Sequence, residues 1–198
     1  MAQYEVAHAP RSLADAVSRD LVITAISVAL GIGLVTWHGA TGSTFSLIIS
    51  WVVGFVLSFF FVYLTHEWGH YLGARLAGAD IPLGPASGIF LGLFDTKAHS
   101  RKQFMWMAMG GEVGYLLPAA ILIGVFWNWS PLEGVAVGAL GFIIQALWVD
   151  VPILWRIHKG ADIDATLSNG LAPKIILSKT LIGWAAMGVG IAGWGALA

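Results

Sequence analysis

The chain has 198 residues, of which 58% are hydrophobic and only 11% are charged, and its formal net charge is −1. Its mean hydropathy is +0.80, and a soluble domain of this length could not cover so much apolar surface. Composition therefore excludes an ordinary soluble fold and indicates an all-α polytopic membrane protein. The absence of cysteine excludes disulfides and thiolate metal ligands. The near-neutral charge gives no reason to expect a nucleic-acid partner.

About five transmembrane helices are expected, in a single membrane domain that covers residues 1–198. The apolar runs that predict them are 21–38, 45–72, 104–127, 134–155 and 175–197. The first 20 residues are polar, and no small-residue cleavage site follows a short apolar core. We therefore expect no removable signal peptide.

The segment between the second and third spans, residues 75–103, has a different texture. It sets many glycines and prolines among apolar residues, which is too broken for a spanning helix and too apolar for a free linker. We expect a re-entrant or interfacial hairpin beside the second span, with short extended pieces whose edge could pair with an extended peptide. A simply packed loop fits the same composition equally well.

Positive charge is distributed unevenly along the chain. All ten Lys and Arg residues fall on one side of the predicted spans: Arg11, Arg19, Arg75, Lys97, Arg101, Lys102, Arg156, Lys159, Lys174 and Lys179. The positive-inside rule then puts the N-terminus and the 75–103 loop in the cytoplasm and the C-terminus outside. This arrangement predicts a multi-pass protein of a bacterial-type inner (plasma) membrane.

The second span carries the sequence His66-Glu67-Trp68-Gly69-His70. On a helix the two histidines lie at i and i+4 on one face, and two imidazoles so placed can hold one Zn²⁺ at about 2.0–2.1 Å per bond. Glu67 beside the ion could then take a proton from water. Histidines also occur as satisfied core residues, but charged side chains at bilayer depth cost about 2.5–3.5 kcal/mol each. The pattern therefore favours a metal site.

A catalytic zinc usually takes three protein ligands, so two histidines leave one position to fill. The carboxylates considered for it are Glu112, Asp150, Asp162 and Asp164. Asp150 lies about 24 Å along the fourth helix, near the depth of the histidines, whereas Asp162 would lie near 42 Å. We therefore prefer Asp150, with a helix-end carboxylate paired to Arg156 as the alternative. Glu112 is expected near the cytoplasmic face, where its side chain can reach water.

The run from His66 to Gly78, His-Glu-Trp-Gly-His-Tyr-Leu-Gly-Ala-Arg-Leu-Ala-Gly, resembles the site-2 protease family of intramembrane zinc metalloproteases. The resemblance implies a catalytic core over about 45–157, with additional helices at 21–38 and 175–197 and no accessory domain. It also implies that His66 and His70 bind zinc, that Glu67 is the general base and that Asp150 completes the site.

The chain departs from the family pattern at two places. Glu112 stands where the family has proline, and the approach to Asp150 lacks the usual Asn-x-x-Pro. Because of the second departure, Asp162 or Asp164 stays open as the third ligand if the chain re-enters the membrane.

The resemblance implies a zinc-dependent endopeptidase that cuts a transmembrane or juxtamembrane segment near the cytoplasmic side, as in regulated intramembrane proteolysis. Its partners would be a membrane-protein substrate and the lipid bilayer. The alternative is a catalytically inactive, protease-like structural or regulatory subunit of a membrane complex. A metal transporter is disfavoured, because few other carboxylates lie within the spans.

Overall fold

The computed structural model describes residues 11–84, 91–172, 174–181 and 184. Its helices, in order, are α1 (Leu13–Thr41), α2 (Thr44–Leu76), α3 (Arg101–Phe126), α4 (Glu133–His158) and α5 (Ile163–Gly170). The first four are long and apolar enough to cross a membrane, which supports a helical membrane protein. Residues 174–181 are also helical, but most of the predicted span 175–197 lies outside the described residues. The count of five spans stays a prediction.

Side-chain caps explain where the helices begin. Ser12 accepts a hydrogen bond from the backbone N–H of Asp15 at 3.1 Å, so α1 begins well before its apolar run. Ser43 caps α2 in the same way. At α3, Ser100 and Gln103 form a reciprocal capping box. The polar residues around the apolar runs therefore set the first turn of each of these helices.

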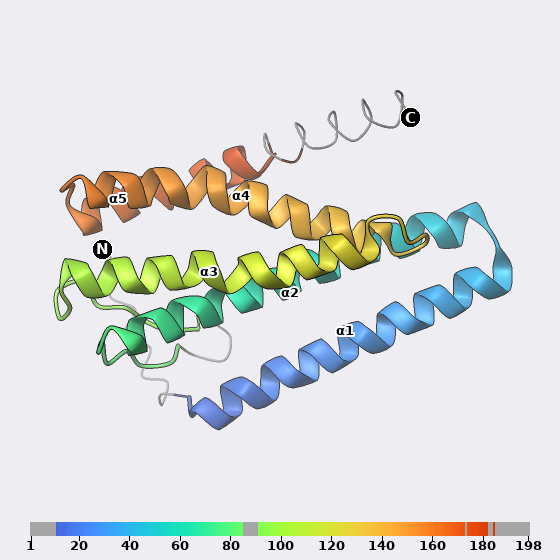
Figure 1. Cartoon of the computed structure of the whole chain (residues 1–198), viewed down its shortest axis with the longest axis horizontal. Coiled ribbons are helices and arrows are strands. Elements are labelled where there is room, and N and C mark those ends of the chain that lie inside the picture. Colours follow the sequence, from blue (N-terminus) through green and yellow to red (C-terminus); the bar gives the residue numbers. More distant parts are fainter. Residues whose placement is uncertain (1–10, 85–90, 173, 182–183, 185–198) are drawn as a thin grey trace.

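The helices α2, α3 and α4 pack against one another, and α1 lies along one side of this bundle (Figure 1). The start of α1, the end of α2, the start of α3 and the end of α4 lie at the same end of the bundle. These are the ends that carry most of the positive charge in the sequence. Figure 1 also shows that the α1–α2 and α3–α4 turns lie at the opposite end.

Glycines let the backbones of α2 and α3 approach closely. A Cβ atom on Gly69 would overlap the carbonyl of Gly110, and one on Gly73 would overlap the carbonyl of Trp106. The contact of α2 with α4 is built in the same way, because a Cβ on Gly138 would overlap the carbonyl of Phe55. Small residues of this kind are typical of membrane helix interfaces, where packing rather than the hydrophobic effect holds helices together.

The helix α1 is attached differently. Its buried residues in the described structure are Ala16 and Asp20, both near its N-terminal end. There the indole N–H of Trp68 donates to Asp20 at 2.8 Å. Farther along, an apolar cavity of about 460 Å³ separates α1 from the bundle.

The loop after α2 contains a short extended pairing. Leu83 and Gly92 form an antiparallel bridge, supported by hydrogen bonds from Gly84 N–H to the Leu91 carbonyl and from Leu93 N–H to the Pro82 carbonyl. Residues 85–90, which the predicted hairpin includes, lie outside the described residues. Leu83 and Leu91 are buried against Ala16 and the rings of α2. The loop thus packs beside α2, and its re-entry into the membrane stays a prediction.

Polar contacts join the ends of α3 and α4. The Arg101 guanidinium at the start of α3 donates to the carbonyls of Ile157, Gly160 and Ala161 at the end of α4. Because the last carbonyls of a helix have no partner within it, Arg101 acts as a C-terminal cap in trans.

Candidate metal centre

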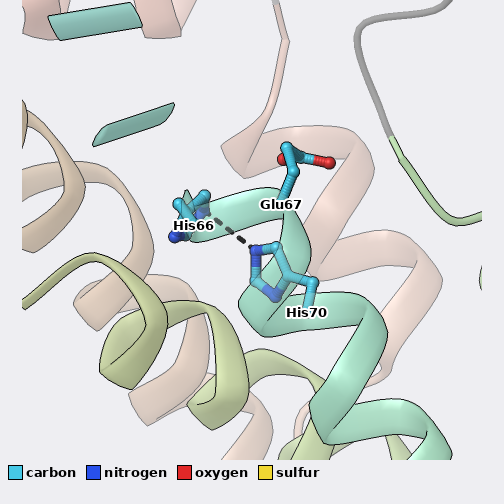
Figure 2. Close-up of side chains that lie close together, drawn as sticks. All are labelled: His66, Glu67 and His70. Atoms are coloured by element: carbon cyan, nitrogen blue, oxygen red, sulfur yellow. Dashed lines mark hydrogen bonds between the residues drawn. The ribbon is translucent and has the colours of Figure 1, made fainter. Parts of the chain in front are cut away.

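The two histidines of α2 face each other. The Nε2 atoms of His66 and His70 lie 2.9 Å apart, and Figure 2 shows the two rings converging on adjacent turns. Two ligands of a tetrahedral zinc at 2.0–2.1 Å would lie about 3.3 Å apart, so a small movement would admit an ion between them. Among the described residues, His66, Glu67 and His70 form a group whose donor atoms lie within 4.8 Å of one another.

The ring of His70 is oriented by α3. Its Nδ1 lies 3.0 Å from the carbonyl of Met107, which can only accept, so Nδ1 carries the proton and Nε2 keeps its lone pair. A histidine that binds a metal usually donates its other N–H in this way. The ring lies against Gly111, where a Cβ atom would overlap it. Glycine at this position of α3 therefore makes room for His70.

His66 is more deeply enclosed. It is 7% exposed, and its ring lies 5.6 Å from the Tyr115 ring and 5.5 Å from the Phe142 ring, centroid to centroid. Its Nδ1 is buried and has no hydrogen-bond partner within the described structure. The aromatic walls exclude water from this side, so His66 can approach an ion or a polar group only through Nε2.

Glu67 lies beside the histidines, with its donor atom within 4.8 Å of theirs, but it is bonded to the loop after α2. It is 5% exposed, and its Oε2 accepts a hydrogen bond from the backbone N–H of Leu91 at 3.0 Å. In Figure 2 the Glu67 carboxylate points away from the facing imidazole nitrogens. The loop after α2 therefore orients this carboxylate by a bond to its backbone.

Asp150, the preferred third ligand, faces His66 from α4. Its Oδ2 lies 3.9 Å from His66 Nε2. No ion pair between Asp150 and Arg156 is found among the described residues. Two residues on, Pro152 lacks the N–H that would bond the carbonyl of Trp148. The Lys179 ammonium donates to that carbonyl at 3.1 Å instead.

The alternative ligands are engaged elsewhere. Asp162 caps α5, accepting from the backbone N–H of Ala165 at 2.8 Å, and Asp164 accepts from the Thr96 hydroxyl. Neither these two residues nor Asp150 belongs to the group of donor atoms within 4.8 Å, but Asp150 lies 3.9 Å from His66 Nε2. The short helix α5 is not among the elements predicted from the sequence, although Asp162 three residues before Ala165 has the form of an N-cap.

The expectation for Glu112 is wrong. This side chain does not reach water: the residue is 8% exposed and its Oε2 accepts from the Tyr115 hydroxyl at 2.8 Å. The reason is the rotation of α3, whose buried stripe includes Gly111, Glu112 and Tyr115 and faces α2 and α4. Close contact at Gly110 turns this stripe inward.

The donor set fits a metal ion of the borderline-soft class. Two neutral imidazoles and a nearby carboxylate are ligands that Zn²⁺ and related transition metals accept, and the cysteine-free chain offers no thiolate. The facing Nε2 atoms also support the fit. Without an ion between them, they interact favourably only when one nitrogen carries a proton and donates it to the other.

These observations define a helical membrane protein with a His-Glu-His cluster that could hold a metal ion. No protein-family model matches the chain, and neither a curated protein nor a solved structure does.

Proposed function

We propose that this protein is an intramembrane zinc metalloprotease that cleaves a transmembrane or juxtamembrane segment near the cytoplasmic side. The observation that carries the proposal is a pair of histidines within an apolar helix whose Nε2 atoms lie 2.9 Å apart. Glu67 directly follows His66 along the chain and belongs to the same group of donor atoms. Polar groups at this depth are costly unless they serve a site. The resemblance of the His66–Gly78 run to the site-2 protease family supports the same reaction.

In this proposal His66, His70 and Asp150 hold zinc, which when bound polarises a peptide carbonyl. Glu67 accepts a proton from the attacking water and passes it to the leaving amine. For this step the Glu67 carboxylate must either lose the hydrogen bond from the Leu91 N–H or use its second oxygen. A helical substrate has to unwind first, because its carbonyls are already hydrogen-bonded.

The extended pairing at Leu83 and Gly92 suggests where the unwound substrate lies. A strand added beside Leu91 would compete with Glu67 for the Leu91 N–H. Substrate binding would then release the Glu67 carboxylate for proton transfer. The proposed orientation, with the N-terminus and this loop in the cytoplasm of a bacterial-type inner membrane and the C-terminus outside, brings water to the site from the cytoplasm.

One observation favours the second candidate, a catalytically inactive structural or regulatory subunit of a membrane complex. The Glu67 carboxylate accepts a hydrogen bond from the loop backbone at Leu91 rather than from either histidine. A residue that only locks the loop to α2 would have this geometry.

The test combines zinc content with cleavage. Purified wild-type protein and the Glu67→Gln variant are assayed for bound zinc and then incubated with a library of single-span peptides in detergent micelles. The protease reading expects about one zinc per chain in both, with new peptide termini only in the wild type. Zinc without cleavage in either protein supports the inactive subunit. A folded wild type that takes up no zinc overturns the metalloprotease.

A further inference from the structure

Asp150 lies near polar side chains contributed by other segments. Its Oδ2 lies 3.9 Å from His66 Nε2 on α2. The His66 ring also packs against the Tyr115 ring of α3, and the Tyr115 hydroxyl donates to Glu112 at 2.8 Å. The ring of His70 lies against Gly111, the residue before Glu112. The Lys179 ammonium bonds the carbonyl of Trp148, two residues before Asp150. Glu112 therefore lies on the face of α3 that contacts both histidines.

Glu112 is the member of this group with an open acceptor. Its Oε1 is buried and has no partner in the part of the chain that the structure describes. Its other oxygen is fixed by the hydroxyl of Tyr115, a fully buried residue whose ring also packs against His66. The carboxylate is therefore held in one orientation beside the candidate metal centre. The site-2 protease family, which this chain resembles, has proline at this position.

We propose that Glu112 is a positioning residue of the metal centre, which supplies the negative charge that retains a divalent cation at His66, His70 and Asp150. Tyr115 fixes the orientation of its carboxylate. Glu112 is bonded to Tyr115 and not to a histidine, so it acts on the ion through its charge rather than as a ligand. The inference rests on the metal centre of the proposed function and adds a residue to it.

A divalent cation held by two neutral imidazoles and Asp150 keeps one positive charge, which a further buried carboxylate can compensate. Replacing Glu112 by glutamine removes one negative charge but keeps the volume and an oxygen that can accept the Tyr115 hydroxyl bond. This substitution therefore separates charge from packing.

The experiment is a zinc titration of the purified metal-free protein by calorimetry, with unfolding of the metal-free protein as a second readout. Glu112→Gln is expected to weaken the zinc Kd by about 10- to 100-fold, as loss of a group supporting metal ligands does. Its metal-free unfolding temperature should not fall below the wild-type value. Glu133→Gln, an exposed carboxylate at the far end of α4, is the matched control and should leave Kd unchanged.

If folded Glu112→Gln binds zinc with the wild-type Kd, this inference is overturned and the proposed function is not. An unchanged Kd together with a lower unfolding temperature has the same consequence and shows that the role of Glu112 is purely structural. If Glu112→Gln fails to fold, Tyr115→Phe takes its place, because it removes the hydroxyl bond and keeps the ring. An unchanged Kd in Tyr115→Phe then overturns the inference, and a weaker Kd supports it. A wild type that binds no zinc overturns the proposed function together with this inference.

Discussion

The contact of α2 with α3 and the contact of α2 with α1 are built in opposite ways. Between α2 and α3 the backbones touch, with Gly69 against Gly110. Between α2 and α1 lies a cavity of about 460 Å³, and α1 carries glycines, Gly31 and Gly33, with no atom of the structure near their missing side chains. The candidate metal centre of His66, Glu67 and His70 lies on the tightly packed side. A site that must hold ligand atoms within fractions of an ångström needs such packing, whereas α1 does not.

The largest effect is expected at the close contact. Gly69→Ala places a Cβ against the Gly110 carbonyl, which is backbone and cannot swing aside. Forcing α2 and α3 apart should cost about 1–3 kcal/mol of stability and weaken zinc binding, because His70 depends on α3 for its orientation. The measurement is unfolding in detergent together with zinc titration.

The control for this prediction is Gly33→Ala on α1, where the new methyl meets nothing within 4 Å. It should leave zinc affinity unchanged and stabilise by up to about 1 kcal/mol through helix propensity. Equal destabilisation by both alanines would show that the two contacts do not differ as the structure indicates.

The next effect is expected at Arg101, which ties the start of α3 to the end of α4. Arg101→Ala leaves the carbonyls of Ile157, Gly160 and Ala161 without this donor. Because Arg101 is exposed, a loss of about 0.5–1.5 kcal/mol is expected, the usual net contribution of a hydrogen bond, measured by unfolding. Lys102→Ala, the neighbouring exposed cation, should cost nothing measurable. If the two variants lose the same stability, the loss reflects net charge and not the cap.

A smaller effect is expected where α1 is tied to the bundle. Trp68→Phe removes the indole N–H that reaches Asp20. Membrane hydrogen bonds contribute about 0.6 kcal/mol on average and at most about 1.7, so α1 should loosen while zinc affinity stays unchanged. Because the chain has no cysteine, a single introduced pair across α1 and α2 can report the loosening by disulfide cross-linking. Loss of zinc binding would contradict the separation of the two regions.

The helices and the histidine pair were accessible from sequence, but the walls of the site were not. Apolar runs locate α1 to α4 because each helix is long and apolar enough to cross a bilayer, and the i, i+4 spacing places His66 and His70 on one face. A depth count also brings Asp150 near them. Depth does not give rotation about a helix axis, which is why the burial of Glu112 was missed.

The rotation of α3 follows from glycine contacts between segments distant in sequence, and no local pattern specifies which glycines meet. The role of Asp162 stayed open in the sequence for a related reason. An isolated aspartate can bind a metal or cap a helix, and α5 is too short to show a periodic pattern. Its cap became clear only with the backbone in place.

The smallest effect is expected at the cavity between α1 and the bundle. Gly31 lines the cavity, whereas Gly39 on the same helix does not, and neither has an atom within 4 Å of its missing side chain. Replacing each by leucine gains the same helix propensity, so the difference in their unfolding free energies isolates filling of the cavity. In a bilayer, lipid tails are as apolar as leucine, so this difference comes from packing alone and should favour Gly31→Leu by less than about 1 kcal/mol. A Gly31→Leu variant less stable than Gly39→Leu would show that α1 closes against α2 in the membrane and that the cavity is not a feature of the folded state there.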